Sequence, residues 1–147
     1  LAEVAMGKCK VGVFFGNAGD GAGETPPGRS VRGVLTDAIL DTGAVLTLVP
    51  QEHVNNLGLR SLGTVNVTLA DNRKVAMERA GPLSVTILGR TCTTDCLVGP
   101  AGCAPILGQI VLRSLDLVFD PVDQTLAVRP ESPFLPTIKM KSLPMAA

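Results

Sequence analysis

The sequence predicts an all-β protein that contains two short helices. Residues 64–79 alternate between apolar and polar side chains, which is the period of a strand with one buried face. The other apolar runs are short and end at Gly, Pro, Asn or Asp, as strands that lead into turns do. Only residues 51–57 and 109–115 have the length and boundaries of a helix. Most of the chain is therefore expected to be strand.

The first third of the chain contains expected strands and one long loop. Residues 11–15 are a short apolar run that ends at a glycine, and residues 31–40 and 44–49 are further apolar segments. Residues 16–30, in contrast, are rich in Gly and Pro and poor in apolar side chains. Because such a segment buries too little surface to offset its ordering entropy, we expect a mobile surface loop there.

The first helix is expected over residues 51–57. Pro50 stands at its start and Gly58 follows its end, which is the usual order of these two residues around a helix. The helix carries His53, the single histidine of the chain. The sequence offers no second histidine and no nearby Ser or Cys nucleophile motif. A surface position on the helix therefore explains His53 better than a role as catalytic base.

A hairpin follows this helix. The alternating residues 64–79 are interrupted by a polar stretch, so two strands should meet in a turn near Asp71 and Asn72. The outer half of the hairpin is polar and charged. We therefore expect it to project into solvent.

The second half of the chain continues with short strands. Gly81 and Pro82 break the chain, and a second hairpin is expected after them. The remaining expected elements are strands at residues 83–87, 92–98, 117–119 and 125–128, and the second helix at residues 109–115. We expect residues 1–130 to form one domain. Residues 131–147 contain three more prolines and should form an extended tail that is weakly ordered unless a partner holds it.

Composition disfavours several classes of partner. The chain has 147 residues, of which 46% are hydrophobic and 18% charged, which suits one core. Basic and acidic residues both number 13, so no net field attracts nucleic acid or an anionic membrane. The chain also lacks Trp and Tyr, and its four Phe residues offer bases little surface for stacking. No apolar run is long enough to span a bilayer, and we expect no membrane association.

The four cysteines are expected to be reduced thiols. Cys92 and Cys96 fall in one expected strand, where they would lie about 13 Å apart, too far for a disulfide. Their spacing fits no standard zinc pattern, and we expect neither a metal nor another cofactor. Reduced thiols and the lack of a signal pattern at the start of the chain lead us to expect a cytoplasmic protein.

The most informative stretch is residues 39–44, with the sequence Ile-Leu-Asp-Thr-Gly-Ala. It places a carboxylate between two apolar runs, where the charge of Asp41 is costly to desolvate and requires a compensating arrangement. Gly43 can supply a tight backbone turn at this point. A strand-end turn in which Asp41 caps its own backbone explains the tripeptide alone about equally well.

Together with later segments, this stretch resembles the retropepsin-like (retroviral-type) aspartic proteases, in particular their short cellular and bacterial members. The resemblance covers residues 31–128, and its strongest part is the Asp-Thr-Gly-Ala element followed about 65 residues later by Ile-Leu-Gly. Supporting segments are Leu-Gly-Leu at residues 57–59, Leu-Ala-Asp-Asn at 69–72 and Leu-Asp-Leu-Val-Phe-Asp-Pro at 115–121. The resemblance implies a closed-barrel-like acid-protease fold, with one lobe per chain.

The resemblance also implies roles for individual residues. Asp41 corresponds to the catalytic aspartate, and an active-site loop continues through Thr42, Gly43 and Ala44. The hairpin tip corresponds to a flap that covers the substrate and consists here of Ala70, Asp71, Asn72 and Arg73. Ile106, Leu107 and Gly108 correspond to the segment that supports the substrate cleft.

The implied activity requires a second copy of the chain. Two carboxylates that share one proton supply both the acid and the base of peptide hydrolysis, and this sequence contains a single Asp-Thr-Gly. The resemblance therefore implies a homodimeric aspartic endopeptidase with one Asp41 from each chain on a twofold axis. Its substrate would be an extended peptide or an unfolded protein.

Two departures from the viral pattern concern the dimer interface. Viral members carry an acidic residue just after Asp-Thr-Gly-Ala and a basic residue after the later glycine. Here these positions hold Val45-Leu46 and Gln109-Ile110, so a dimer must depend on apolar packing and terminal strands. The flap is also charged where viral flaps are rich in glycine. A catalytically silent dimerisation or peptide-binding module with the same fold is the alternative function.

Overall fold

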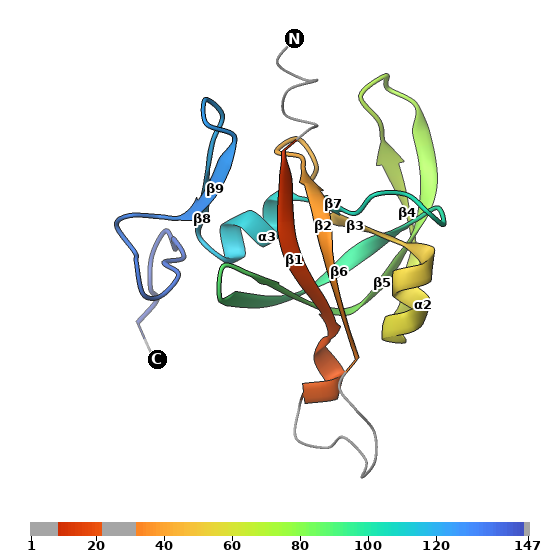
Figure 1. The fold of residues 1–147 in the computed structure, drawn as a ribbon, viewed down its shortest axis with the longest axis horizontal. Coiled ribbons are helices and arrows are strands. Elements are labelled where there is room, and N and C mark those ends of the chain that lie inside the picture. The colour runs from red at the N-terminus through yellow and green to blue at the C-terminus, as the bar shows by residue number, and fades with distance from the viewer. Residues whose placement is uncertain (1–8, 22–31, 146–147) are drawn as a thin grey trace.

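The computed structural model describes residues 9–21 and 32–145, and it confirms the all-β prediction. Strands make up about half of the described chain, and the helices are short (Figure 1). In chain order the elements are β1 (Lys10–Asn17), η1 (Ala18–Gly21), β2 (Gly33–Leu40), β3 (Thr47–Pro50), α2 (Gln51–Leu57), β4 (Arg60–Thr68), β5 (Lys74–Ile87), β6 (Arg90–Gly99), β7 (Ile106–Leu107), α3 (Gln109–Ser114), β8 (Leu117–Asp120) and β9 (Thr125–Val128).

The main sheet closes on itself. Neighbouring strands follow the order β1-β2-β7-β3-β6-β5-β4, and β1 also pairs with β5 through the register Phe15 opposite Val85. Strands β1, β2, β7, β3, β6 and β5 therefore form a ring, and β4 extends the sheet outside it. Closure leaves few unpaired backbone groups at strand edges. The expected barrel-like sheet is confirmed.

Alternating side chains of these strands fill the inside of the ring. On β5, for example, Leu83, Val85 and Ile87 are buried while the residues between them are partly exposed. On β1, Phe15 is fully buried, whereas its neighbour Phe14 is 40% exposed. The period of two expected of half-buried strands thus directs one face of each strand to the core.

The first helix has the predicted limits. Pro50 is the residue before its first turn, and Gly58 ends it with a left-handed backbone (φ 64°). The amide of Gly58 donates to the carbonyl of Asn55 at 3.1 Å. Glycine suits this position because it has no Cβ to oppose a positive φ. Val54 and Leu57 bury the inner face of the helix.

Strand β5 corrects the prediction of a break at Gly81 and Pro82. The strand continues through both residues and serves the two hairpins, pairing with β4 and with β6. The pairing with β6 shifts register between Ala80 and Leu83. Proline lacks the amide that a regular ladder requires, and a register shift is a place in a sheet where it can lie. The break predicted from sequence is thus a local irregularity within one long strand.

The start of the predicted loop at residues 16–30 is also corrected. Strand β1 continues to Asn17, η1 follows it, and the side chains of Asn17 and Asp20 are buried. The prediction failed because it counted only apolar burial, whereas these polar groups are buried with their hydrogen bonds satisfied. The rest of that prediction, residues 22–30, lies outside the described residues.

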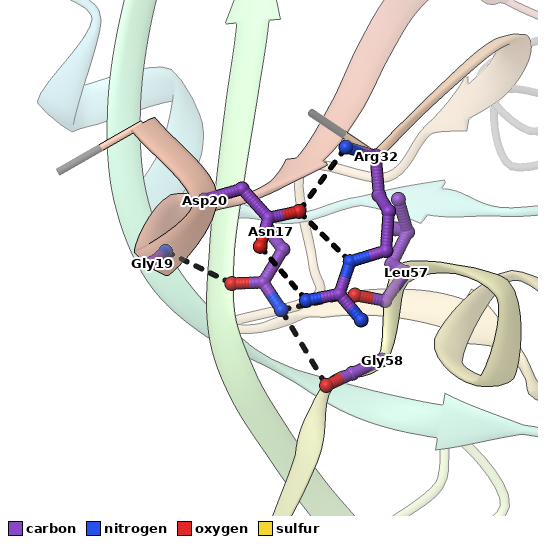
Figure 2. Close-up of polar contacts among 6 residues, drawn as sticks. All are labelled: Asn17, Gly19, Asp20, Arg32, Leu57 and Gly58. Carbon is purple, nitrogen blue, oxygen red and sulfur yellow. Dashed lines mark hydrogen bonds and ion pairs between the residues drawn. The ribbon is translucent and has the colours of Figure 1, made fainter. Parts of the chain in front are cut away.

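Figure 2 shows how these polar groups hold β1, η1 and the end of α2 together. The amide nitrogen of Asn17 donates to the carbonyl of Leu57 at 2.9 Å, and its oxygen accepts the amide of Gly19 at 2.9 Å. The Asp20 carboxylate accepts two bonds of 2.8 Å from the Arg32 guanidinium and one of 3.1 Å from the Arg32 amide. A two-pronged pair of this kind fixes both side chains.

Strands β8 and β9 form a separate two-stranded hairpin, and hydrogen bonds made by the side chains of two buried residues hold its base. The carboxylate of the buried Asp116 accepts bonds from Arg129 Nε (2.8 Å), from the Ser132 hydroxyl and from the amide of Thr137 (3.0 Å). The buried Arg90 donates to the carbonyls of Leu115, Asp116 and Ser132. The beginning of the tail is therefore fastened to the domain, although the sequence predicts an unsupported extension from residue 131.

We expect the Asp116→Asn substitution to reduce stability in a pH-dependent way. The hydroxyl of Ser132 and the guanidinium of Arg129 hold the pKa of the Asp116 carboxyl well below its ordinary value of 3.8. A carboxyl whose pKa is lowered on folding stabilises the protein above its unfolded pKa, and this contribution is lost as the pH falls. Asn suits the positive φ of Asp116 (53°), so the substitution removes charge without backbone strain.

Thermal unfolding of both proteins between pH 7 and pH 3 measures this effect. The melting temperature of the variant should lie below that of the wild type at neutral pH, and the gap should narrow below about pH 4. Asp123→Asn, a change at an exposed carboxylate, is the control. Its melting temperature should stay close to that of the wild type at every pH. A gap that stays constant down to pH 3 would contradict the assignment.

Candidate active site

Asp41 lies directly after β2, at the start of a loop that covers residues 41–46. Its side chain is exposed, and its carboxylate accepts the amide of Gly43 at 2.9 Å. Its carbonyl accepts the amide of Ala44 at 3.2 Å. The loop occupies the beginning of the strand predicted over residues 44–49, so that β3 starts only at Thr47. The self-capping turn considered from the sequence is thus present, and no hydrogen bond from the described residues engages the second carboxylate oxygen.

A segment distant in the sequence holds this loop. Strand β7 pairs in parallel with the end of β2, and the amide of Asp41 donates to the carbonyl of Leu107 at 3.1 Å. The amide of Gln109 donates to Ala44 at 2.7 Å, and that of Ile110 donates to Val45 at 3.1 Å. The first amides of a helix have no partners within the helix, and here α3 uses them to fix the loop.

Side chains complete the attachment of the loop. The amide nitrogen of the Gln109 side chain donates to the carbonyl of Thr42. The hydroxyl of the buried Thr47 accepts the amide of Gly108 at 3.2 Å. Sequence reasoning recorded Gln109 only as a departure from the viral pattern and did not single out Thr47. A polar residue directly after Ile-Leu-Gly is the signal that could have identified Gln109.

Position 108 requires glycine because a side chain would not fit there, and not because of its backbone conformation. Its φ of −105° is open to any residue. A Cβ at this position would lie 2.6 Å from the carbonyl oxygen of Leu46 and 2.8 Å from that of Val45. These atoms belong to the backbone of the Asp41 loop, which could only yield by moving. Gly108 thus allows the two segments of the site to approach closely.

The predicted flap is the hairpin between β4 and β5. Its turn is closed by the amides of Leu69 and Asn72, and Asn72 has a positive φ of 66°. Within the turn, Arg73 Nε contacts the Asp71 carboxylate at 2.6 Å, and Ala70 is exposed. The tip and the loop after β2 reach the same end of the molecule, the upper end in Figure 1. The prediction that the hairpin projects into solvent is confirmed.

Thr42, Gly43, Ala44 and the Ile106–Gly108 segment are therefore brought together around Asp41. The flap residues lie at the same end but make no hydrogen bond or ion pair to the Asp41 loop among the described residues. Two exposed apolar side chains lie at this loop. Val45, within the loop, is 65% exposed, and Ile110, whose amide donates to the carbonyl of Val45, is 38% exposed. The positions of the missing viral ion pair thus carry apolar surface.

His53 and the cysteines do not belong to this site. His53 is half-buried in α2 instead of on the surface, and its Nδ1 atom has no hydrogen-bond partner in the described part of the chain. All four cysteines are free thiols. Burial raises the pKa of Cys96 to about 12, with a smaller effect of the Asp95 charge, so thiolate chemistry is disfavoured there.

Two hollows of the described surface lie away from Asp41. One of about 330 Å³ is lined by Asn17, Asp20 and Arg32, near the polar cluster of Figure 2. Another of about 480 Å³ lies against the β8–β9 hairpin. The residues that the structure describes contain no group of three or more His, Cys, Asp or Glu placed to hold a metal ion. None of the described helices has both the length and the apolar character needed to cross a membrane.

Comparisons with known proteins found one type of similarity. No protein-family model matches the chain, and no curated protein matches its sequence. Among solved structures, the chain is similar to EIAV protease in complex with the inhibitor HBY-793. The two are 25% identical, the match covers 55% of this chain and 77% of the other, and the TM-score is 0.47.

Proposed function

We propose that this protein is an aspartic endopeptidase that is active as a homodimer and hydrolyses extended polypeptides. The observation that carries the proposal is the position of Asp41. Its carboxylate is exposed at the end of a core strand, and the backbone around it is fixed by β7, by the first amides of α3 and by Gln109. A catalytic group needs this combination of access and fixed position.

The proposed reaction uses two Asp41 carboxylates that share one proton. The ionised carboxylate removes a proton from a water molecule, which attacks the peptide carbonyl carbon. The protonated carboxyl donates to the carbonyl oxygen, and the resulting tetrahedral species breaks down as the nitrogen is protonated. Gly43 orients one oxygen of each carboxylate by its amide, at 2.9 Å. The other oxygen is then available to the shared proton and the water.

A second copy of the chain is proposed because the sequence holds a single Asp-Thr-Gly. A dimer with twofold symmetry brings identical surfaces together, so both Asp41 loops can meet on the axis. The exposed Val45 and Ile110 side chains border the loop and supply apolar surface for this contact. Since no ion pair occupies these positions, the dimer should be held mainly by apolar burial.

An extended polypeptide is the proposed substrate. The hairpin of β4 and β5 rises at the same end of the molecule as Asp41 (Figure 1). A segment placed between a hairpin and a sheet can use its backbone amides and carbonyls as a further strand would. Such recognition needs an unfolded or flexible stretch of the target protein.

A silent dimerisation or peptide-binding module is the second candidate function. The bond from the Gly43 amide to Asp41 favours it, because a purely structural turn would contain the same bond. Exposure of the carboxylate argues for the enzyme, since a structural cap gains nothing from a solvent-facing oxygen.

Turnover measured against protein concentration tests the proposal. The assay follows cleavage of a denatured, reduced protein at mildly acidic pH, and light scattering follows association in the same samples. We expect specific activity to rise with concentration and to level off when the dimer is fully formed. A dimer that cleaves nothing would support the silent module, and a monomer with concentration-independent activity would exclude the shared dyad.

A further inference from the structure

The last eight described residues, 138–145, are exposed and apolar yet have no partner in the structure. We call this segment the arm. Its large apolar side chains are all at least 66% exposed: Ile138, Met140, Leu143 and Met145. No arm residue makes a hydrogen bond or ion pair within the described part of the chain, where the tail's last attachment is the Thr137 amide on Asp116. Apolar side chains grouped in this way usually mark a contact surface.

The arm has the pattern of an edge strand. Ile138 and Met140 alternate with Lys139 and Lys141, so that residues 138–141, when extended, present an apolar face and a basic face. Eight extended residues reach about 26 Å beyond Thr137. The arm is thus long enough to reach a neighbouring molecule.

The β8–β9 hairpin offers a surface that fits this arm. It is a two-stranded sheet, and both of its outer edges are unpaired among the described residues. A two-stranded sheet is marginally stable by itself and gains from a third strand. Its inner face packs on the core through Phe119, Leu126 and Val128. Its outer face carries Val118, which pairs with Ala127, and borders the hollow of about 480 Å³.

Charge on the hairpin complements charge on the arm. Asp120 and Asp123 are exposed at the hairpin turn, and Asp120 also lines the hollow. The arm brings Lys139 and Lys141. Pairs of opposite charge on neighbouring strands stabilise a sheet, and like charges there destabilise it.

Within the described part of one chain, the arm does not pair with the β8–β9 hairpin. The bond between Thr137 and Asp116 holds the tail at the base of the hairpin. From there the hairpin rises to the upper end of the molecule in Figure 1, whereas the tail turns back beside the base of the hairpin and ends below it. The arm therefore leaves its own hairpin uncovered, and the hairpin of another molecule is the available partner.

We propose that the arm of one copy docks as an added strand on the β8–β9 hairpin of a second copy, and that two copies exchange arms. This proposal rests on the homodimer of the proposed function and names a contact outside the Asp41 loops. Exchange by both copies satisfies the symmetry of a closed dimer, because each copy gives one arm and receives one.

Two charge-reversal variants, measured alone and as a mixture, distinguish exchange of arms between two copies from docking of the arm on the hairpin of its own chain. One variant carries Lys139→Glu with Lys141→Glu, and the other carries Asp123→Lys with Thr125→Lys. Thr125 is exposed on the outer face, and both hairpin changes retain the Asp120 carboxylate that caps the turn at 2.9 Å. Sedimentation at low salt measures the dissociation constant of each variant alone and of an equal mixture, while circular dichroism confirms that each is folded.

We expect each variant alone to associate about tenfold more weakly than the wild type, because each pair of changes places like charges on the arm and on the hairpin. The mixture should regain wild-type affinity, since each arm then meets a hairpin of opposite charge. A single chain that carries all four changes should also associate normally. If that chain is restored but the mixture is not, the arm docks on its own hairpin and the exchange is wrong.

Deletion of residues 138–147 gives a second measure, because it removes the arm and leaves Ser132 and Thr137 on Asp116. The deletion should weaken association by at least as much as charge reversal and restore full specific activity at high protein concentration. Unchanged association of all these variants would overturn the arm exchange while leaving the endopeptidase proposal intact. Association is measured without turnover, so an inactive protein would still report on the arm.

Discussion

Replacing Asp41 by Asn should abolish peptide cleavage and leave the fold intact. The substitution removes the group that must alternate between acid and base, and loss of such a group costs about 10²–10⁴-fold in rate. The amide oxygen of Asn can still accept the Gly43 amide, which lies 2.9 Å from the carboxylate in the wild type. The loop should therefore keep its conformation, and dimerisation should be unchanged or stronger because two like charges are removed from the axis.

The matched control is Asp37→Asn. Asp37 lies on β2, the strand that leads to Asp41, and it is also exposed. This variant should cleave the denatured protein at the wild-type rate. Initial rates at saturating protein concentration and melting temperatures are compared for the three proteins. An Asp41→Asn protein with wild-type activity would show that another group performs the chemistry.

Replacing Gly108 by Ala should impair both stability and activity. The added methyl group would meet the backbone carbonyls of Leu46 and Val45 at 2.6 Å and 2.8 Å, well inside van der Waals contact. Overpacking of this kind costs about 1–3 kcal/mol when neighbours can shift. The neighbours here are the backbone of the Asp41 loop, so relief of the clash displaces the carboxylate. Small displacements of a reacting group reduce rates strongly.

Gly12→Ala is the control for this change. Gly12 is exposed in β1, and a Cβ there would have no atom within 4 Å. Alanine in a strand interior is favoured over glycine by about 0.5–1 kcal/mol, so this variant should be as stable as the wild type or slightly more so. Denaturant unfolding and turnover are measured for both variants. If Gly108→Ala matched Gly12→Ala in both, the close approach of the two segments would not matter for function.

The sequence determined the elements of the fold because their signals are local. Alternation over residues 64–79, glycine after α2 and short apolar runs each report on neighbours along the chain. The Asp-Thr-Gly stretch is likewise a local signal, and it indicates the candidate site. Predictions from local signals were wrong where polar side chains are buried. Asn17 and Asp20 looked like loop residues, and only their partners Leu57 and Arg32 explain their burial.

Only the tertiary structure decided how the site is held. The bond between Gly108 and Thr47 joins residues 61 positions apart, and that between Gln109 and Thr42 joins residues 67 apart. The pairing of β1 with β5, which closes the ring, is likewise long-range. Such contacts depend on how the sheet closes, and no pattern within a single segment encodes them. The sequence thus indicated which group to propose as the reactive one, and the packing of distant segments determined that its backbone is fixed and that the residue is exposed.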